Sequence, residues 1–534
     1  MQSYSLTVDK FLDHAAKWFG DREVVEADAG KVVSRMTYSV LRERSNRMSG
    51  ALAALGLQQG DRVGTLAWNT LHHFEIYYAA MGAGFVCHTL NPRLTVEQLA
   101  AMVNEAEDRT LAVSEDLLPL LEKLAPHCRT VEHIIILDAG SPTRRLDGPA
   151  ATVWLYEDLL ASQGTPLPWG EFDEQSPAGL CYTSGTTGRP KGVLYTHRSN
   201  YLHTLRSLQA DAMAIRHEDS VLVAVPMFHA NGWGMPFAGP AVGAKLVLPG
   251  RHTDGQSLAG LMHEEQVTIA VGVQTVWLGL VEQLKEDGSD LPALERVVIG
   301  GSNCPDALLR QMEEGLGAYV QTSWGMTELS PLGTISPSTA EVKGARASGR
   351  PPLGLDLKLT DARGKTLHQQ RGEVGHLKAK GASVVDRYFK ADSDALDEEG
   401  YFDTGDLATI DEDGNLTICG RSKDLIKSGG EWINPAEIEA IIGRDPSVSL
   451  VAVISRPHHK WGERPLLVVQ PRPGREARAD ELIASLRGKV ADWWIPEEIA
   501  RVSAMPLAAS GKIDKRRLRA DYEAGKIATE QVKR

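Results

Sequence analysis

The chain has 534 residues, of which 42% are hydrophobic and 24% charged, and its formal net charge is −13. This length exceeds that of one ordinary domain, and the composition is typical of a globular protein that buries a large core. The negative net charge excludes a general nucleic-acid binder, because such a protein carries a basic face.

Helix-like and strand-like segments alternate over about the first 350 residues. Residues 41–55 carry apolar side chains at helical spacing, and the strand-like run 62–67 follows them. The same pairing recurs at 97–107 and 110–113, at 257–265 and 267–273, and at 307–315 and 319–322. Short apolar runs at 180–182, 244–248 and 297–299 are typical of buried strands. This alternation predicts an α/β architecture for the first part of the chain.

Beyond this region the pattern changes to shorter strand-like runs with turns at 361–364 and 411–414. A polar run at 420–424 separates the strand-like run 416–419 from a further module. That module carries helix-like runs at 435–442 and 479–493 and strand-like runs at 450–454 and 466–469. We therefore expect a large N-terminal body over 1–419, with packed sheets and helices in several subdomains. A hinge at 420–424 and a small, mobile α+β cap domain over 425–534 would follow it.

A loop rich in glycine and hydroxyl groups, TSGTTGRPKG at 183–192, follows the strand-like run 180–182. Its glycines permit a tight turn whose backbone N–H groups face a phosphate, and Lys191 adds positive charge. The loop is not a Walker-type site, because Pro190 precedes the lysine and Gly192 replaces the required Ser or Thr. Taken alone, the run also fits a solvated surface loop.

The loop resembles the phosphate loop of the adenylate-forming superfamily, which contains acyl-CoA synthetases, luciferases and adenylation domains. Further motifs of that family follow in its order: WGMTE at 324–328, YFDTGD at 401–406, GRSKD at 420–424 and P-x-x-x-x-G-K at 506–512. One loop would be weak evidence, whereas this ordered set is specific. The resemblance implies the adenylate-forming fold, with ATP, Mg²⁺ and coenzyme A as the cofactors and cosubstrates.

The resemblance also implies roles for residues in the first reaction. A carboxylate is a poor electrophile, so such an enzyme makes an acyl-adenylate and expels pyrophosphate, and the crowded charge calls for a cation and preorganised donors. Glu328 is the expected Mg²⁺ ligand, because hard cations favour carboxylate oxygen. Thr327 would donate to the α-phosphate, and Lys512 would bridge that phosphate and the substrate carboxylate from the C-terminal cap. Taken alone, Glu328 or Lys512 would be interpreted as a solvated surface group.

The nucleoside and the thiol acceptor have expected contacts as well. Asp406 would accept from both ribose hydroxyls with help from Arg421, and Trp324 would stack on adenine where the family more often has Tyr. Lys423 takes the hinge position, about which the cap is expected to rotate before thiol attack. The residues expected to bind ATP or coenzyme A are Thr183, Ser184, Gly185, Thr186, Thr187, Gly188, Lys191, Gly301, Ser302, Trp324, Gly325, Met326, Asp406, Arg421, Lys423, Lys427, Gly429, Gly430, Glu431 and Trp432.

The segment PMFHANGWG at 226–234 resembles the family segment beside the acyl pocket. His229 corresponds to a gate near the reacting carboxylate and is counted with Thr327, Glu328 and Lys512 as catalytic, although it also fits a satisfied, half-buried histidine. Trp233 resembles the tryptophan gate of fatty acyl-CoA synthetases and also fits a core residue. The expected substrate-binding residues are His229, Trp233, Val273, Gln274, Gly300 and Gly301, and none is basic.

Trp432 in GGEWIN also resembles fatty acyl-CoA synthetases more than aryl-CoA ligases. Together with Trp233, this resemblance implies a medium- to long-chain fatty acid as substrate. The runner-up is a short or sulfur-containing acid, because CHTLNPRL at 87–94 and FHANGWG also resemble methylmercaptopropionate-CoA ligases. An aryl acid is a further alternative. A non-enzymatic acyl-adenylate-binding protein is disfavoured, because it would be expected to lack Glu328, Asp406 or Lys512.

Further expectations concern the thiol acceptor, the cellular location and the oligomeric state. A peptide-synthetase module would continue into a carrier domain after Lys512, so a stand-alone ligase that uses coenzyme A is expected. The scattered cysteines and the absence of a signal-like or membrane-spanning apolar run indicate a cytoplasmic protein with no transmembrane segment. Because relatives are often homodimers, a homodimer without a nucleic-acid partner is expected.

Overall fold

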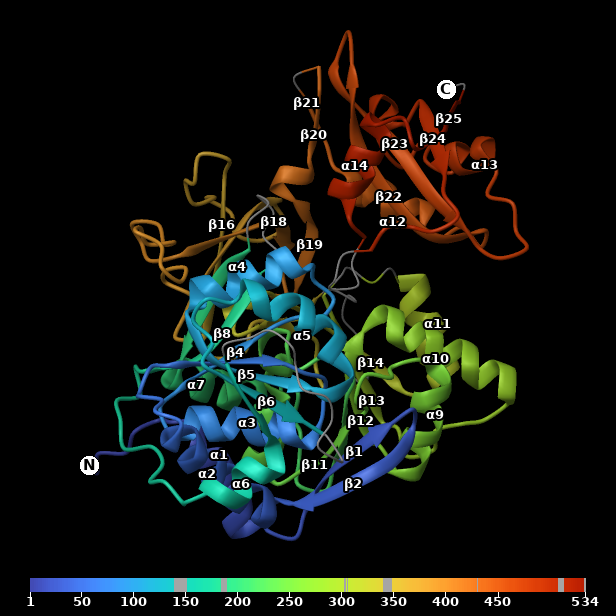
Figure 1. The fold of residues 1–534 in the computed structure, drawn as a ribbon. Helices are drawn as coiled ribbons and strands as arrows, with labels where there is room; N and C mark the ends of the chain where they lie inside the picture. Colours follow the sequence, from blue (N-terminus) through green and yellow to red (C-terminus); the bar gives the residue numbers. More distant parts are fainter. Residues whose placement is uncertain are drawn as a thin grey trace.

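The computed structural model describes residues 1–138, 151–183, 190–301, 304, 306–339, 348–429, 431–507 and 513–532 (Figure 1). Its largest sheet has the strand order β15-β14-β13-β12-β10-β11-β1-β2. Pairs from β1 to β14 along this order are parallel, and β2 and β15 pair antiparallel at the two edges. The strands of this first sheet are β1 (Glu23–Asp28), β2 (Lys31–Thr37), β10 (Ser220–Val223), β11 (Lys245–Leu248), β12 (Ile269–Val273), β13 (Arg296–Gly300), β14 (Tyr319–Gly325) and β15 (Leu332–Ile335).

A second sheet has the strand order β7-β6-β5-β3-β4-β8-β9, parallel except for the β8–β9 hairpin. Its strands are β3 (Arg62–Leu66), β4 (Val86–Thr89), β5 (Asp108–Ser114), β6 (His133–Leu137), β7 (Thr152–Leu155), β8 (Pro177–Thr183) and β9 (Lys191–Thr196). Parallel strands need crossover connections, and helices supply them. The helices of the body are α1 (Asp9–Trp18), α2 (Tyr38–Ala54), α3 (Leu71–Gly82), α4 (Val96–Ala106), α5 (Leu118–Leu124), α6 (Tyr156–Gln163), α7 (His197–Ser207), α8 (Met235–Val242), α9 (Gly255–Glu264), α10 (Gln274–Asp287) and α11 (Asp306–Leu316).

The two sheets and their helices form layers. The inner core joins α1, α2, α3 and α8 to side chains of both sheets, so these helices lie between the sheets. A second cluster packs α9, α10 and α11 on the outer face of the first sheet, and a third packs α4 and α5 on the outer face of the second. Figure 1 shows α9 to α11 on the right and α4 above the second sheet. This arrangement confirms the predicted α/β body, because strands buried on both faces are nearly all apolar.

A small antiparallel sheet, in the order β16-β17-β18-β19, follows the body. The expected turns within it form, and Gly364 and Gly414 adopt positive φ values of 82° and 88°. These turns connect short strands, as the sequence predicted. The strands are β16 (Leu355–Thr360), β17 (Gly375–Gly381), β18 (Phe402–Ile410) and β19 (Leu416–Arg421).

The C-terminal module has its own sheet, β21-β20-β23-β24-β25 with β22 paired to β23, and apolar clusters on its two faces. It stands apart at the top of Figure 1, as expected for a small α+β cap. Its elements are β20 (Ile426–Ser428), β21 (Glu431–Ile433), α12 (Pro435–Ile442), β22 (Val448–His458), β23 (Gly462–Pro471), α13 (Ala479–Ala484), β24 (Glu498–Arg501), α14 (Lys515–Glu523) and β25 (Thr529–Gln531).

One predicted helix of the cap is wrong. The run 479–493 was expected to be a single helix, but α13 ends at Ala484. Gly488 then takes a φ of 70°, which turns the chain out of helical geometry. Trp493 and Trp494 follow in a short 3₁₀ turn and pack against the cap core. Their positions in the sequence fit a helical pattern because both side chains are packed against the core, although the backbone between them and α13 is not helical.

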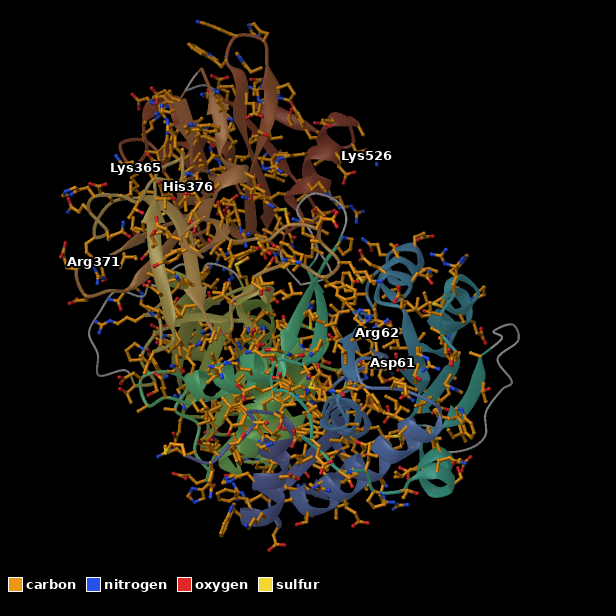
Figure 2. All side chains as sticks on the ribbon, turned by 90° about the vertical axis from the view of Figure 1, so that its left-hand side faces the viewer. Asp61, Arg62, Lys365, Arg371, His376 and Lys526 are labelled. Atoms are coloured by element: carbon orange, nitrogen blue, oxygen red, sulfur yellow. The ribbon has the colours of Figure 1, made fainter. Side chains whose placement is uncertain are left out.

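Side chains of the four-stranded sheet reach the predicted hinge. His376 of β17, labelled in Figure 2, lies on the four-stranded sheet and its Nδ1 atom is 3.0 Å from the hydroxyl of Ser422. Asp424 accepts a hydrogen bond of 3.0 Å from Arg519 of α14. The hinge is therefore held from both modules. Among the described residues, no helix combines the length and the apolar character needed to cross a membrane.

Candidate active site

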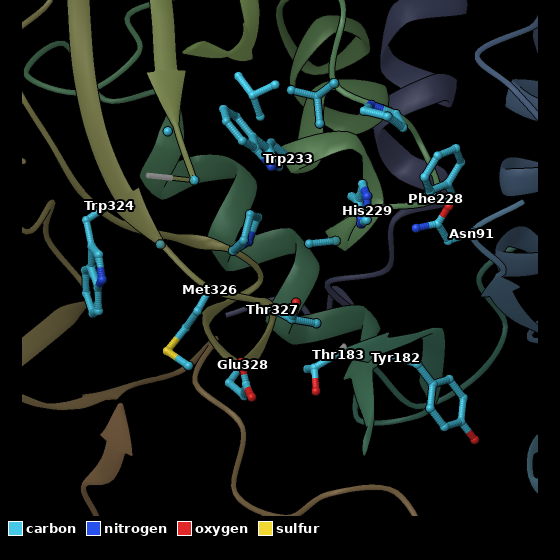
Figure 3. Close-up of a pocket in the computed structure, with 18 of the residues that line it drawn as sticks. Asn91, Tyr182, Thr183, Phe228, His229, Trp233, Trp324, Met326, Thr327 and Glu328 are labelled. Carbon is cyan, nitrogen blue, oxygen red and sulfur yellow. The ribbon is translucent and has the colours of Figure 1, made fainter. Parts of the chain in front are cut away.

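A cavity of ≈ 730 Å³ opens where the carboxyl ends of the two parallel sheets meet. Parallel strands direct their carboxyl ends to one edge, and ligand sites of open α/β sheets form there. The ends of β10, β12, β13 and β14 of the first sheet and of β4 and β8 of the second supply most of the wall. Figure 3 places Trp324 on one side, Trp233 on a second, and Asn91 and Tyr182 on a third.

The phosphate-loop motif lies at this edge. Thr183 ends β8 and pairs with Lys191, which begins β9, and both residues line the cavity. A Cβ on Gly192 would lie 2.9 Å from that of Phe389, so a glycine is required for this close approach. The remaining predicted loop residues, Ser184, Gly185, Thr186, Thr187 and Gly188, lie outside the described residues.

Thr327 and Glu328 follow β14 in a short 3₁₀ turn that faces the cavity. Tyr195 donates its hydroxyl to the Thr327 carbonyl over 2.8 Å, and the backbone N–H of Val385 donates to the Glu328 carbonyl over 2.8 Å. The Glu328 carboxylate accepts from the hydroxyl of Tyr388 over 2.9 Å. The turn is thus fixed from two other elements, which preorganises both side chains.

Helix α7 holds the chain just beyond this turn. The guanidinium of Arg206 is buried and donates through Nη2 to the carbonyls of Leu329 and Leu332. His203 accepts from the backbone N–H of Leu332 over 3.1 Å. Burial lowers the pKa of Arg206 to about 10. A buried cation has lost its hydration and needs hydrogen-bond acceptors in the protein. For the Arg206 guanidinium, the backbone carbonyls of Leu329 and Leu332 supply them.

Trp324, Asp406 and Arg421, which the sequence assigned to the nucleoside, lie in contact with one another. The indole N–H of Trp324 donates to Asp406 over 2.9 Å, and Nε of Arg421 pairs with the other carboxylate oxygen over 2.7 Å. Asp406 is only 2% exposed and lies behind the cavity wall, whereas Trp324 and Arg421 form part of that wall. A Cβ on Gly333 would lie 2.4 Å from the Trp324 ring, so the glycine makes room for the indole.

His229 and Trp233 flank a left-handed turn. Ala230, Asn231 and Trp233 take φ values of 41°, 56° and 55°, which cost non-glycine residues about 1–2 kcal/mol each. Such backbone strain persists only where the surroundings impose it, and it gathers at functional sites. The turn directs His229 and Trp233 to the same cavity from its two ends (Figure 3).

The side of the cavity around Trp233 is mostly apolar. The indole Cη2 atom would lie 3.0 Å from a Cβ on Gly300, so the ring stands directly against the end of β13. Of the predicted pocket residues, Val273, Gly300 and Gly301 line the cavity, whereas Gln274 turns into α10 and is not among the described wall residues. Ser302 lies outside the described residues. We call this the Trp233 side, and its wall is formed by Ala224, Val225, Trp233, Val273, Thr275, Val276 and Gly300.

The predicted cofactor-binding residues from Lys423 to Trp432 lie in two places. Lys423 lines the cavity, and burial followed by the charge of Arg421 lowers its pKa. Lys427, Gly429, Glu431 and Trp432 lie on the β20–β21 hairpin, which Figure 1 shows pointing away from the body. The Trp432 side chain is 52% exposed there. Gly430 and the predicted catalytic Lys512 lie outside the described residues.

Sequence reasoning missed Arg93 and Tyr388, which lie outside the five motifs. Arg93 follows β4 and lines the third side of the cavity, with its guanidinium 6.0 Å from the centre of the Phe228 ring. Within the described part of the chain it has no ion-pair partner, and burial lowers its pKa. The surrounding wall, which we call the Arg93 side, is formed by Thr89, Asn91, Arg93, Leu94, Gln98, Met102 and Tyr182.

Glu328 fits the carboxylate ligand of a Mg²⁺ ion. Its side chain is mostly buried, and one oxygen is held by Tyr388, which leaves the second oxygen for a cation. The described residues contain no cluster of three or more His, Cys, Asp or Glu side chains that could hold a metal ion by themselves. Mg²⁺ typically binds through one or two carboxylates together with substrate phosphates, and this donor set matches that pattern.

Comparisons with known proteins agree with this site. Residues 12–389 match the family described as AMP-binding enzyme, and residues 437–512 match the AMP-binding enzyme C-terminal domain. A 3-methylmercaptopropionyl-CoA ligase of Ruegeria lacuscaerulensis is 41% identical, with 98% of each chain covered. A medium-chain-fatty-acid–CoA ligase of Ectopseudomonas oleovorans is 40% identical, with 98% of this chain and 97% of the relative covered.

A solved anthranilate CoA ligase in complex with anthranoyl-AMP shares the fold, with a TM-score of 0.87, 24% identity and coverage of 98% of this chain and 99% of that chain. The family match extends over the two-sheet body and the cap alike. The chain therefore belongs to the AMP-binding enzyme family of the adenylate-forming superfamily and is an AMP-forming acid–thiol ligase.

Proposed function

We propose that the protein is an acyl-CoA ligase that activates a medium- to long-chain fatty acid with ATP and transfers the acyl group to coenzyme A. The observation that carries this proposal is one cavity with three chemically different sides. The side around Trp324, Arg421 and Lys423 presents hydrogen-bonding and cationic groups, and the Trp233 side is mostly apolar. The Arg93 side carries a cation that has no ion-pair partner among the described residues. These sides suit a nucleotide, an acyl tail and an anionic thiol carrier that meet near His229 and Thr327.

In the first half-reaction a carboxylate oxygen of the acid attacks the α-phosphorus of ATP. The bond from that phosphorus to the β-phosphate breaks, and pyrophosphate leaves with the bonding electrons. Thr327 is proposed to donate its hydroxyl to an α-phosphate oxygen, and Lys512 to bridge that phosphate and the carboxylate. Their positive and donor groups stabilise charge that develops as the bond forms.

Glu328 would hold the Mg²⁺ ion, with Tyr388 supporting the carboxylate. When bound, the ion neutralises phosphate charge during the displacement. Lys191, at the cavity wall, brings a further positive charge near the phosphates. Asp406 and Arg421 are proposed to recognise the ribose, with Trp324 against the adenine.

In the second half-reaction the coenzyme A thiolate attacks the acyl carbonyl carbon, and AMP leaves as the acyl–oxygen bond breaks. Lys427, Gly429, Glu431 and Trp432 of the β20–β21 hairpin, which were expected to bind ATP or coenzyme A, are not among the described residues that line the cavity. We infer that the cap, residues 425–534, rotates about the hinge 420–424 and brings the hairpin to the cavity.

The choice of a fatty acid is supported by the Trp233 side. Among its described residues there is no lysine or arginine, so a second carboxylate on the acid would be buried without a counter-ion. An unbranched apolar tail meets Val225, Val273 and Val276 without such a cost. The 40% identical medium-chain-fatty-acid–CoA ligase is consistent with this choice.

A short sulfur-containing acid such as 3-methylmercaptopropionate is the second candidate. The Trp233 indole stands against Gly300, which shortens the apolar side, and the 41% identical relative carries the corresponding name. A thioether tail is as apolar as a methylene tail, so the wall chemistry does not separate the two. Cavity depth decides between them.

The function is tested by measuring pyrophosphate release with ATP and a panel of straight-chain acids, 3-methylmercaptopropionate and an aryl acid, with and without coenzyme A. The proposal expects turnover that requires coenzyme A, yields the acyl-thioester and AMP, and is fastest with a medium- or long-chain fatty acid. Fastest turnover with 3-methylmercaptopropionate would support the second candidate. Turnover without coenzyme A, or with none of the acids, would contradict both.

A further inference from the structure

Residues 383–389 form a strap that connects the turn carrying Glu328 with the start of β9. The backbone N–H of Val385 donates to the Glu328 carbonyl, and that of Phe389 donates to the Gly192 carbonyl, each over 2.8 Å. Ser330 donates its hydroxyl to the carbonyl of Ser383 over 2.9 Å. The strap therefore fixes the Glu328 turn relative to the strand that begins at the end of the phosphate loop.

Tyr388, within this strap, makes the same connection with its side chain. Its hydroxyl donates to Oε1 of Glu328 over 2.9 Å, and the ammonium of Lys191 lies 4.5 Å from the centre of its ring. All three side chains line the cavity. One aromatic residue thus contacts the predicted metal ligand with its polar end and the predicted phosphate-binding cation with its face.

The direction of the hydrogen bond follows from the two groups. An ionised carboxylate has no proton to give, so the phenol O–H of Tyr388 donates and Glu328 accepts. A donor on one carboxylate oxygen fixes the orientation of Glu328 and leaves the second oxygen facing the cavity. An ammonium over an aromatic face is attracted by the ring quadrupole, which restrains the long Lys191 side chain.

We propose that Tyr388 is a positioning residue that holds Lys191 and Glu328 in register, so that the phosphate-binding cation and the metal-binding carboxylate meet the same nucleotide. The proposal rests on the proposed use of ATP with Mg²⁺. The two contacts belong to different parts of the side chain. Loss of the hydroxyl and loss of the ring should therefore have different effects.

The experiment compares the wild type with Tyr388→Phe and Tyr388→Leu by calorimetric titration of ATP into the full-length protein, once with excess Mg²⁺ and once with EDTA. Tyr388→Phe keeps the ring and loses the donor to Glu328. Removing such a support of a metal ligand typically weakens metal binding about 10–100-fold, so the gain in ATP affinity from Mg²⁺ should fall by about tenfold. Its ATP affinity in EDTA should stay within about twofold of the wild type, because Lys191 keeps its ring contact.

Tyr388→Leu should lose the Mg²⁺-dependent gain and also bind ATP more weakly in EDTA. Tyr319→Phe is the matched control, because it removes a tyrosine hydroxyl that contacts Ser336 outside the cavity, and both titrations should remain at the wild-type values. Thermal unfolding without ligand establishes that each variant is folded. Two results would overturn the proposal: a Tyr388→Phe variant with an unchanged gain from Mg²⁺, or one that loses affinity equally with Mg²⁺ and with EDTA.

Failure of the proposed function is recognised separately. If the wild type itself does not bind ATP, or gains nothing from Mg²⁺, the nucleotide assignment of the cavity is wrong. If the wild type behaves as expected and only the Tyr388→Phe result differs, the nucleotide assignment stands and the role of Tyr388 is rejected.

Discussion

The indole N–H of Trp324 donates a hydrogen bond of 2.9 Å to Oδ2 of Asp406, a carboxylate that is almost fully buried. Arg421 occupies the other oxygen over 2.7 Å. The carboxylate is therefore held from two sides by donors that themselves line the cavity. A ring that sequence comparison assigned to adenine stacking also orients the residue expected to recognise the ribose.

Trp324→Phe tests this relationship, because it keeps an aromatic face and removes the donor. Loss of a hydrogen bond to a charged group costs about 1.5–3 kcal/mol, which corresponds to a rise in the KM for ATP of about tenfold or more. Steady-state pyrophosphate release at varied ATP measures it. A fall in kcat with an unchanged KM for ATP would show that the indole acts elsewhere.

Thr183, Thr327 and Glu328 were singled out because their motifs resemble those of the family, and the structure places all three at strand ends beside the cavity. Their roles in binding and catalysis remain predictions. Tyr388 and Arg93 were missed because their neighbours lie far away in sequence. Lys191, for example, is brought to Tyr388 by the tertiary fold, and no local spacing encodes that contact.

The misassigned helix has a comparable cause. Apolar spacing continues from Ala479 to Trp493, but the turn at Gly488 interrupts the backbone and the tryptophans reach the cap core by another path. Periodicity reports which side chains are buried, and only the backbone geometry decides whether one helix buries them. The domain boundaries at 419 and 425 remain predictions.

Arg93→Gln is predicted to weaken coenzyme A use selectively. The Arg93 side carries a cation that has no ion-pair partner among the described residues, and coenzyme A brings phosphates. Removal of one charged contact should raise the KM for coenzyme A by about tenfold, less at high salt, and leave the KM for ATP within about twofold. Arg129→Gln, at an exposed site outside the cavity wall, is the control. A larger effect on ATP or on the acid would assign Arg93 to a different ligand.

Lys423→Pro tests the hinge. Proline fixes φ near about −65° and restricts the preceding residue, so the hinge should no longer absorb the dihedral change of a rotating cap. The variant should form acyl-adenylate in a single turnover and lose thioester formation. Lys423→Ala removes the same side chain without the restraint and should retain more of the second step. Normal turnover by the proline variant would contradict rotation at this residue.

Glu26 gives a prediction for stability against pH. Its carboxylate on β1 accepts from the backbone N–H of Leu71, the first residue of α3, over 2.9 Å, and burial raises its pKa from 4.5 to about 7. A raised carboxyl pKa means that the folded state binds the proton more tightly, so this stabilisation is present at low pH and is lost as the pH rises from about 4.5 to about 7.

Glu26→Gln keeps an oxygen acceptor for Leu71 and removes the titration. The variant should therefore be the more stable protein near neutral pH, and the difference should grow by about 1–3 kcal/mol between about pH 5 and about pH 8. Thermal midpoints of the two proteins across this range measure the effect. If the difference between the two thermal midpoints does not change with pH, the titration of Glu26 does not affect stability in this range.

The central claim is that this cavity joins a carboxylic acid to AMP, with Lys512 from the cap completing the site, before a chemically separate transfer to coenzyme A. The direct measurement takes Lys512→Ala and follows the two half-reactions independently: acid-dependent pyrophosphate release, and thioester formation from supplied acyl-adenylate and coenzyme A. We expect a severe loss of adenylation, with thioester formation much less affected. An equal loss in both half-reactions would contradict it.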